Sequence, residues 1–363
     1  MTVPYDFAVV GAGMAGASLA AALAPAGARV LLLEGEHAPG YHATGRSAAF
    51  WTESYGGPGV YPLTAASGPA LRAGGYLTER GALTIARTGA EAELAAFAER
   101  FAALGVRVER LDRDALEARL PALRAGWTCG SLEPDCCDID VAALHQDYLA
   151  AACRMGAELW TAARLVRADG DVHGWALTMA DGRIVRAAVL VNAAGAWADG
   201  VAQLAGVNPL GIQAYRRTVA QLRTAPAPPA DLPLVLELGG TFYFKPQAGR
   251  LWLSPHDETP SAPCDAAAEE LDVALAIERF GTAVGWTVER VEHRWAGLRA
   301  FAPDRLPVYG FAADNPRFCW FAGQGGFGIQ TAPAAAALGA ALLSAAPPGP
   351  VDPAPYSPAR FTG

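Results

Sequence analysis

Three glycines near the N-terminus have the spacing of a phosphate-binding turn. Gly11, Gly13 and Gly16 follow the apolar run Tyr5–Val10 and open the small-residue stretch Met14–Ala26, which we expect to be a helix. In such a turn the first glycine allows the tight bend, the second lets the backbone approach a pyrophosphate, and the third lets the helix press on the strand. The diphosphate of a dinucleotide would then lie at the positive end of the helix.

An acidic residue completes this pattern. Glu34 ends a second apolar run, Arg29–Glu34, about 20 residues after the first glycine. A carboxylate at this point accepts hydrogen bonds from a ribose 2′-hydroxyl and would repel a 2′-phosphate. The strand, turn, helix and strand therefore predict a β-α-β dinucleotide site, and they argue against NADP.

Two further small-residue segments could lie against a flat ring or an anion. The first contains Gly45, Arg46, Ser47 and Ala48, and its alternative is an ordinary polar turn. The second, Gly323–Thr331, places four glycines before an expected helix, whose amides could stabilise negative charge on a reduced ring. Its alternative is a simple glycine-rich turn. The cofactor contacts expected there are Gly323, Gly325, Gly326, Phe327, Gly328, Ile329 and Gln330.

An arginine and a tyrosine stand where a substrate could be held. Arg299 ends the mostly apolar segment Trp295–Arg299, and a guanidinium can grip a carboxylate through two hydrogen bonds. A surface arginine is the alternative. Strand alternation puts Tyr243 and Lys245 on one face. Lys245, the only lysine of the chain, is expected to be a rim or structural charge.

Alternating strand and helix patterns must position these residues. Apolar strand patterns recur over Leu159–Val191, where the last strand runs into Asn192–Gly195, and again over Leu210–Leu253. Asp140 is expected to cap a helix that reaches Met155. Three further expectations concern Ser47–Trp51 as a short helix, Ser131–Asp138 as a loop, and Asp265–Arg279 as a helix.

The order of these elements predicts two interleaved domains. Nucleotide-type elements occur at both ends and in the middle of the chain, and β-rich stretches lie between them. The expected fold class is α/β plus a mixed β-sheet, with a Rossmann-like domain interleaved with a smaller α+β domain. We assign residues 1–75, 135–206 and 290–346 to the dinucleotide-binding domain, 76–134 and 207–289 to the substrate-binding domain, and 347–363 to a proline-rich tail.

Composition narrows the class of partner. The chain has 363 residues and a formal net charge of -8, with 52% hydrophobic and 18% charged residues. A globular protein is indicated, and the acidic balance gives no reason to expect nucleic acid or an anionic membrane. The six cysteines show no metal-ligand spacing, so free thiols and no metal are expected. No signal peptide or membrane-spanning run is apparent, so the expected location is the cytoplasm.

Taken together, the motifs resemble the D-amino-acid oxidase superfamily of FAD-dependent oxidoreductases. The likeness is closest to bacterial D-amino-acid dehydrogenases of the D-arginine type. It is carried by Tyr5–Glu34, Gly40–Gly56, Asp138–Tyr148, Ala187–Gly206, Trp295–Phe301 and Gly323–Thr331. The resemblance implies non-covalently bound FAD extended along the first domain, with a mixed sheet covering the flavin. Covalent attachment through His42 or a cysteine is the less favoured alternative.

The resemblance also assigns site residues. It implies that the substrate carboxylate meets Arg299, Tyr243 and Tyr55, with Arg217 or its neighbour Arg216 as a second arginine. It further implies that Ala194 and Gly195 lie near the ADP half of FAD. Two departures concern specificity, because Phe50 stands where the D-arginine-type enzymes often carry histidine, and the strand Gly81–Ala86 carries no acid. Both favour an apolar or aromatic substrate side chain.

The predicted activity is the oxidative deamination of a D-amino acid to a 2-oxo acid and ammonia, by hydride transfer to flavin N5. Alternatives are oxidation of an N-methylated or cyclic imino acid or of a 2-hydroxy acid, and a flavin-binding subunit without turnover. Oxygen, a quinone or a dye remain open as the electron acceptor.

Overall fold

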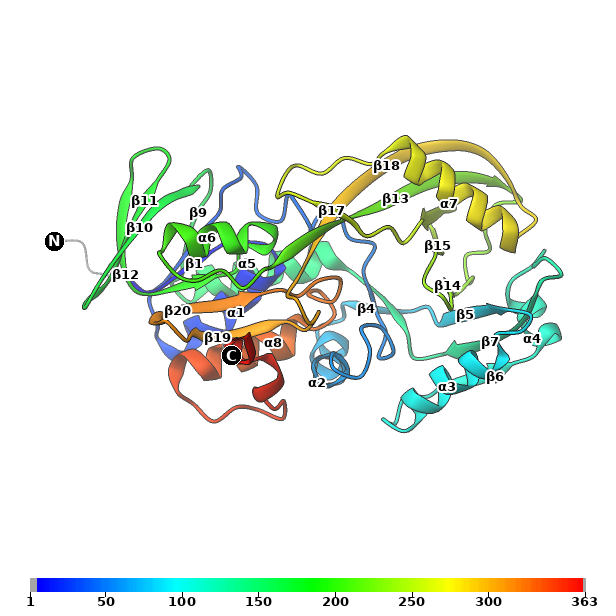
Figure 1. Cartoon of the computed structure of the whole chain (residues 1–363), viewed down its shortest axis with the longest axis horizontal. Coiled ribbons are helices and arrows are strands. Elements are labelled where there is room, and N and C mark those ends of the chain that lie inside the picture. The colour runs from blue at the N-terminus through cyan, green and yellow to red at the C-terminus, as the bar shows by residue number, and fades with distance from the viewer. Residues whose placement is uncertain (1–4, 362–363) are drawn as a thin grey trace.

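The chain forms two lobes joined by long strands, as the ribbon in Figure 1 shows. The structure is a computed structural model, and it describes residues 5–361. One lobe is built on an eight-stranded sheet and the other on a nine-stranded sheet, and a three-stranded sheet belongs to neither. The chain passes between the lobes several times, so each lobe is assembled from separate stretches of sequence.

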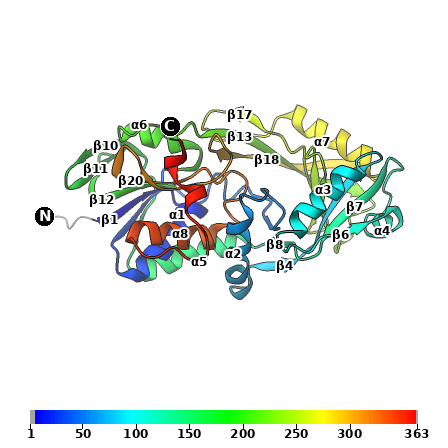
Figure 2. The ribbon, with the colours of Figure 1, turned by 60° about the horizontal axis from the view of Figure 1, so that its bottom comes forward.

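The first lobe has a parallel centre with helices on both faces. β1 (Tyr5–Val10) pairs in parallel with β2 (Val30–Leu33) and β12 (Ile184–Asn192). All four residues of β2 are buried, as expected for a strand covered on both faces. Helices α1 (Met14–Leu23), α5 (Val141–Arg154) and α8 (Ala332–Ser344) lie on one face, and α6 (Ala198–Leu204) lies on the other (Figure 2). The remaining strands of this sheet are β9 (Glu158–Trp160), β10 (Leu165–Asp171), β11 (Gly174–Met179), β19 (Val308–Ala312) and β20 (Asn315–Ala322).

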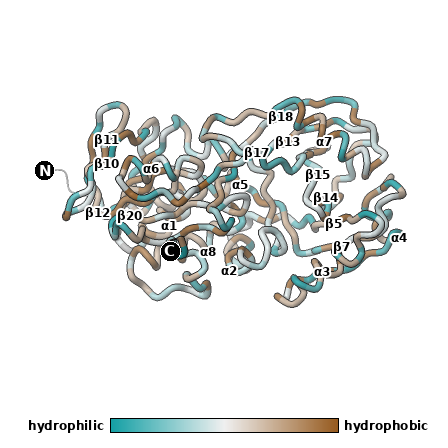
Figure 3. The backbone as a smooth tube through the Cα atoms, in the orientation of Figure 1, coloured by the Kyte–Doolittle hydropathy of each residue, from teal (hydrophilic) through white to brown (hydrophobic). Residues whose placement is uncertain are grey.

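The core of this lobe follows from the sequence pattern. Helix α1 is almost entirely small or aliphatic, and α8 contacts it directly. Figure 3 shows hydrophobic residues along much of the central strands. Small side chains on α1 and α8 allow the two helices to pack closely on the sheet, which brings the start of α1 to the edge where β1 and β12 end.

The second lobe is a largely antiparallel sheet dominated by two long strands. β13 (Gln213–Ala225) and β18 (Thr287–Phe301) pair from Gln213–Phe301 to Ala225–Thr287. Helix α7 (Glu270–Ala283) packs against this sheet. The remaining elements are β5 (Ala82–Arg87), α3 (Glu91–Ala102), β6 (Glu109–Leu111), α4 (Arg113–Arg119), β7 (Trp127–Glu133), β14 (Leu234–Glu237), β15 (Tyr243–Gln247), β16 (Arg250–Ser254) and β17 (Thr259–Ser261).

The domain boundary expected at residue 290 is wrong. β18 begins at Thr287 and pairs with β13 along its whole length, so residues 290–301 belong to the second sheet. The reason is that β18 stays paired with β13 through two register shifts, and its C-terminal half buries Ala296, Leu298, Ala300 and Phe301. The return to the first lobe comes after Phe301.

Pairing between distant segments overrides two local expectations near the junction. The short helix expected at Ser47–Trp51 is instead β3 (Phe50–Trp51), and the loop expected at Ser131–Asp138 contains the end of β7 and the start of β8 (Cys137–Ile139). β3 and β4 (Leu77–Glu79) both pair with β8. Strands this short are stabilised by partners far away in sequence, so local composition does not reveal them.

Two helical segments differ from expectation, and a third agrees with it. α7 begins at Glu270 rather than Asp265, and residues 265–269 instead lie outside any helix or strand. α2 (Tyr61–Ala73) was not anticipated. Asp140 caps α5 as expected, with its carboxylate accepting a hydrogen bond from the Ala143 amide at 3.0 Å. In the C-terminal tail, Val351 and Tyr356 are buried.

Candidate active site and cofactor cleft

A continuous cleft of about 520 Å³ runs from the glycine turn of the first lobe to the β13–β18 pair of the second. It is lined by segments around residues 10–15, 33–36, 40–48, 193–204, 297–300 and 324–329, and by Arg217, Val219 and Tyr243. The cleft therefore collects most of the motifs that the sequence singled out.

The glycine turn has little room for side chains. Gly11 has φ +101°, and a Cβ there would lie 2.4 Å from the Ala193 carbonyl oxygen. A Cβ on Gly16 would lie 1.8 Å from the Gly11 carbonyl oxygen, so helix α1 presses directly on the turn. Gly13 lines the cleft, and a Cβ there would meet Thr44 Oγ1 at 3.2 Å. The close packing agrees with the roles expected for Gly11 and Gly16, and the approach of a pyrophosphate to Gly13 stays a prediction.

Glu34 lies in the cleft and also braces the turn. One carboxylate oxygen accepts a hydrogen bond from the Ala12 amide at 3.0 Å, and the other accepts one from the Glu36 amide at 3.0 Å. A carboxylate has about four acceptor positions, so it can also receive ribose hydroxyls.

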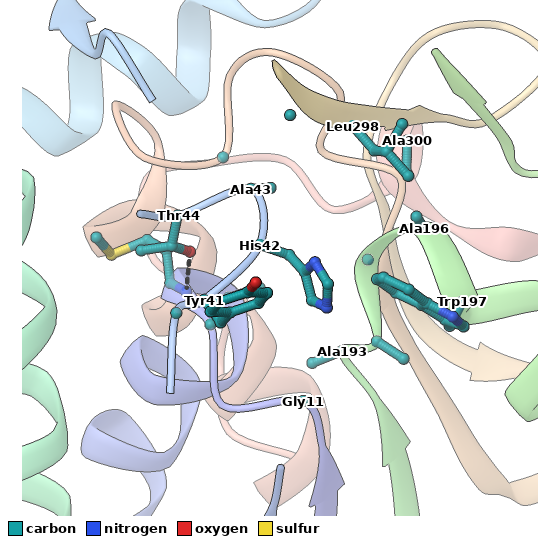
Figure 4. A pocket seen from close by; sticks show the side chains of 18 of the residues that line it. Gly11, Tyr41, His42, Ala43, Thr44, Ala193, Ala196, Trp197, Leu298 and Ala300 are labelled. Carbon is teal, nitrogen blue, oxygen red and sulfur yellow. Dashed lines mark hydrogen bonds between the residues drawn. The ribbon is translucent and has the colours of Figure 1, made fainter. Parts of the chain in front are cut away.

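The segment from Tyr41 to Thr44 crosses the cleft. In Figure 4 the His42 ring stands between Tyr41 and Trp197, above Gly11 and Ala193. His42 Nε2 lies 3.0 Å from a Glu36 carboxylate oxygen, and its ring centre lies 4.6 Å from that of Trp197.

Two residues that sequence reasoning missed hold the glycine turn in shape. Thr44 Oγ1 accepts a hydrogen bond from the Met14 amide at 2.9 Å. His145, from α5, has Nε2 2.8 Å from the Ala12 carbonyl oxygen, so this nitrogen carries the proton and donates it. Burial lowers the pKa of His145. Both residues lie in stretches that carry the family resemblance, Gly40–Gly56 and Asp138–Tyr148, but their roles depend on contacts between distant elements that the sequence does not display.

The predicted Gly45–Ala48 segment lies at the cleft, but its arginine is engaged by protein. Ser47 and Ala48 line the cavity, whereas Gly45 packs on the Gly40 carbonyl. Arg46 pairs with Asp265 and donates to the Ala266 carbonyl at 2.7 Å. Its guanidinium therefore ties the two lobes together, and a contact with a cofactor phosphate stays a prediction.

In the second glycine segment, Gly323–Thr331, some residues line the cleft and others pack behind it. Gly325, Gly326, Gly328 and Ile329 line the cleft, as do Ala194 and Gly195 from the end of β12. Gly323, Phe327 and Gln330 do not line it. Phe327 packs on Phe301 and Tyr55, and Gln330 is only 2% exposed and bonds to the backbone of residues 52–55.

Two arginines, the buried Arg217 and the half-buried Arg299, lie at the far end of the cleft. Arg217 on β13 is opposite Gly297, and Arg299 on β18 is opposite Tyr215, so the two arginines are diagonal neighbours on one sheet face. Arg299 donates to the Tyr55 hydroxyl at 2.5 Å, and its guanidinium lies directly against Gly326. Arg217, Arg299 and Tyr243 all line the cavity.

The positive charge of this pair is incompletely balanced. Arg217 donates to the Asp257 carbonyl at 2.8 Å and to Glu258 at 3.2 Å, but Arg305 shares Glu258. Within residues 5–361, the buried Nη1 of Arg217 has no hydrogen-bond partner. Burial lowers the pKa of Arg217, and the Arg299 charge lowers it further. Two like charges in a buried site favour the arrival of an anion.

Arg216 does not belong to this site. Successive strand residues point to opposite faces, and Arg216 pairs with Glu269 and Asp272 near α7. Of the two neighbours between which the sequence left the choice open, Arg217 is the one in the cleft.

His256 is a further residue at this end of the cleft that sequence reasoning left without a role. Its Nδ1 hydrogen-bonds to the Gly240 carbonyl, and its ring centre lies 5.7 Å from that of Tyr243. Burial, with the Arg217 and Arg299 charges, lowers the pKa of His256 to about 3. The imidazole is therefore neutral, with Nδ1 as the donor and Nε2 as an acceptor.

The geometry fits an extended dinucleotide. A side chain at Gly13 would enter the cleft where the backbone must approach a diphosphate, and Glu34 stands at the ribose position. At the other end, Gly325, Gly326, Gly328 and Ile329 line the cleft together with Gly297–Ala300, of which Figure 4 shows Leu298 and Ala300. Among residues 5–361, no group of three or more His, Cys, Asp or Glu side chains could hold a metal ion, and no helix could cross a bilayer.

Comparison with known proteins agrees with this geometry. A family model described as DAO, FAD dependent oxidoreductase, matches residues 6–342. A curated relative is the tRNA 5-methylaminomethyl-2-thiouridine biosynthesis bifunctional protein MnmC of Maricaulis maris (strain MCS10). It is 30% identical over 347 residues, which cover 91% of this chain and 50% of that protein. The chain thus spans about half the length of this relative.

Two solved structures share the fold over nearly their full length. The glycine oxidase from Geobacillus kaustophilus has a TM-score of 0.85 at 24% identity and covers 98% of both chains. The L-proline dehydrogenase from P. horikoshii has a TM-score of 0.86 at 19% identity and covers 100% of this chain and 99% of that one. Since the family model matches nearly the whole chain and the cleft fits the cofactor, this chain belongs to the DAO family of FAD-dependent oxidoreductases.

Proposed function

We propose that this enzyme oxidises a D-amino acid with an apolar or aromatic side chain to the 2-oxo acid and ammonia. The observation that carries the proposal is the pair Arg217 and Arg299, which line the end of the cofactor cleft together, with a buried guanidinium nitrogen of Arg217 left without a hydrogen-bond partner among residues 5–361. A substrate carboxylate would balance this charge and accept the free hydrogen bonds.

The hydroxyl groups beside the arginines support the same orientation of the substrate. Tyr55 is already hydrogen-bonded to Arg299, and Tyr243 lines the cleft with its ring near Phe50. A carboxylate held by the two arginines and these hydroxyls would have its α-carbon directed along the cleft toward the Gly325–Ile329 wall. Holding the reacting atoms in one orientation is the main contribution such a site can make.

Apolar surroundings support the choice of side chain. Phe50 is 7% exposed, and its ring packs on Tyr55 and Tyr243. The same cluster includes Ala82, Cys136, Leu234 and Leu236. Glu133 is paired with Ala82 across the strands, but burial raises the pKa of its carboxyl, which disfavours an ionised partner for a cationic side chain.

The residues of the chain would bind, orient and shield the substrate. FAD, when bound, supplies a two-electron acceptor for the α-hydrogen as a hydride. Arg217 and Arg299 would hold the carboxylate, while the neutral Nε2 of His256 offers a hydrogen-bond acceptor close by. The amine must be unprotonated to release a hydride, and two buried positive charges favour its neutral form. The imino acid that leaves then hydrolyses in water to the 2-oxo acid and ammonia.

A second candidate is oxidation of glycine or of an N-substituted or cyclic amino acid. Two proteins similar to this chain are named glycine oxidase and L-proline dehydrogenase, and the carboxylate site would serve such substrates equally well. The D configuration rests on the resemblance of the sequence motifs to D-amino-acid dehydrogenases. A 2-hydroxy acid is a third possibility, whereas membership of an oxidoreductase family sets aside a flavin-binding subunit without turnover.

One anaerobic experiment separates these candidates. The purified enzyme is mixed without oxygen with D- and L-amino acids of graded side chains, glycine, sarcosine, D- and L-proline and 2-hydroxy acids, and loss of flavin absorbance is followed. Fastest bleaching by an apolar or aromatic D-amino acid is the expected result. Fastest bleaching by sarcosine or proline would transfer the assignment to the second candidate. Acid precipitation of the same protein should release the yellow colour if FAD is held without a covalent bond.

A further inference from the structure

The segment that carries Tyr55 has no regular secondary structure of its own. Residues 52–60 form turns between β3 and α2, yet the Tyr55 hydroxyl must be held within hydrogen-bonding distance of Arg299. We propose that Glu133 and Gln330 are positioning residues. Together they fix the backbone of the segment Thr52–Tyr55, and this keeps the Tyr55 hydroxyl within hydrogen-bonding distance of Arg299. The inference rests on the proposed function, because it assigns the Arg299–Tyr55 pair to the substrate carboxylate.

Gln330 contacts both ends of this segment from the first lobe. Its Oε1 accepts a hydrogen bond from the Thr52 amide at 3.4 Å, and its Nε2 donates to the Tyr55 carbonyl at 3.2 Å. Nε2 also donates to Thr64 Oγ1 at 3.0 Å, which anchors the amide group to α2. The side chain is 2% exposed, so water offers these backbone groups little competition.

Glu133 contacts the middle of the segment from the second lobe. Its Oε1 accepts a hydrogen bond from the Glu53 amide at 2.7 Å, whereas its buried Oε2 has no hydrogen-bond partner among residues 5–361. The carboxyl is 5% exposed. Adjacent amides, those of Thr52 and Glu53, are thus held by side chains of different lobes.

Packing then directs the tyrosine ring. The Tyr55 ring lies between Phe50, at 5.3 Å between ring centres, and Phe327, at 5.2 Å. With the backbone held by Glu133 and Gln330 and the ring held by two aromatic neighbours, the hydroxyl has one direction left, toward Arg299. Loss of either polar contact would let the segment relax and move the hydroxyl while the rest of the cleft stays in place.

The test measures binding of a simple carboxylate, benzoate, to the FAD-loaded enzyme through the shift in flavin absorbance. Glu133→Ala is expected to raise the Kd of benzoate about five- to thirtyfold. Glu133→Gln keeps an oxygen that accepts the Glu53 hydrogen bond and should restore the Kd to within about twofold. Glu109→Ala, at an exposed site of the same sheet, is the matched control and should change nothing.

A double-mutant cycle distinguishes positioning from general stability. If Glu133 acts through Tyr55, then Glu133→Ala has no further effect in a Tyr55→Phe enzyme, because the hydroxyl it positions is already gone. Gln330→Ala should give the same non-additive pattern, and it serves as the second route should Glu133→Ala fail to fold. Additive losses in both cycles would overturn the proposal.

Three other outcomes have separate meanings. A shift in preference toward or away from cationic D-amino acids in Glu133→Gln would show that Glu133 contacts the substrate side chain, which also overturns the positioning role. Unchanged benzoate binding in both Tyr55→Phe and Arg299→Ala would remove the carboxylate site itself, and with it the proposed function. Weaker benzoate binding in Tyr55→Phe and Arg299→Ala, with unchanged binding in Glu133→Ala and Gln330→Ala, would reject the positioning role and leave the proposed function in place.

Discussion

At the scale of single residues, Arg299 offers the most direct test of the substrate site. Replacing Arg299 with alanine removes a desolvated contact worth roughly 2–4 kcal/mol, so kcat/KM is expected to fall about 30- to 1000-fold. The flavin spectrum should persist, since the change lies at the substrate end of the cleft. Steady-state kinetics and an absorbance spectrum measure both effects.

The matched control lies on the same strand. Arg294 is an exposed residue of β18 that pairs with Glu270, and Arg294→Ala should leave kcat/KM unchanged. Equal losses in the two variants, or no loss in Arg299→Ala, would take Arg299 out of the site.

His256 predicts how stability depends on pH. The pKa of its imidazole falls from 6.5 to about 3 on folding, chiefly through burial and then through the two arginines. Between these values the unfolded chain binds the extra proton, so stability is complete above about pH 6.5 and is lost as the pH falls toward 3. At pH 4 this group alone would cost roughly 3 kcal/mol.

The variant His256→Asn should therefore lose less stability between pH 7 and pH 4 than the parent enzyme does. Urea unfolding at several pH values measures the difference. His173→Asn, at an exposed turn, is the control. Parallel pH curves for the parent and His256→Asn would contradict the prediction.

At the scale of elements, a substitution in the turn between β1 and α1 can test cofactor binding without disturbing the fold. Gly13 has an extended backbone that any residue can adopt, with φ -71° and ψ -171°, and an added Cβ would meet only Thr44 Oγ1 at 3.2 Å. Gly13→Ala should therefore fold but hold FAD at least tenfold more weakly, because the methyl group lies where the backbone must approach the diphosphate.

Titration of apoprotein with FAD measures this loss. Gly281→Ala in α7, where no atom lies within 4 Å of an added Cβ, should leave FAD affinity unchanged and add about 0.5–1 kcal/mol of stability. Unchanged FAD affinity in Gly13→Ala would move the diphosphate elsewhere.

At the scale of the whole molecule, one contact bridges the two lobes beside the cleft. Asp265, in the segment that precedes α7, pairs with Arg46 and accepts a hydrogen bond from the Tyr41 hydroxyl at 3.0 Å. Asp265 is 60% exposed at its side chain, so water and salt screen the pair and its contribution is expected to be weak. Asp265→Ala should accelerate FAD release about two- to fivefold, and added salt should shrink the difference.

Release of FAD into excess apo-acceptor protein, followed by fluorescence, tests this contact. Glu270→Ala breaks a more exposed pair, with Arg294, away from the cleft and should not affect release. An equal effect in the two variants would show that general surface charge, rather than the bridge, sets the rate.

How far the sequence predicts this protein depends on the range of the interactions involved. The β-α-β unit, the Glu34 position, the Asp140 cap and the glycine segments were all recoverable, because each depends on neighbours within one strand, turn or helix. Arg299 and Tyr243 could be predicted as candidates because a guanidinium and a phenol hydroxyl are groups that bind a carboxylate. These features predicted a dinucleotide site, and their resemblance to the D-amino-acid oxidase superfamily predicted an FAD-dependent oxidoreductase before any distance was known.

Only the tertiary structure decided which side chains meet. Arg217 rather than Arg216 faces the cleft because register on β18 determines the face, and β3 replaces an expected helix because β8 pairs with it. His145, Thr44, His256 and Glu133 gain their roles from elements distant in sequence, and none carries a local signature. Local patterns specify what a segment can do, whereas long-range pairing and burial determine which of those abilities is used.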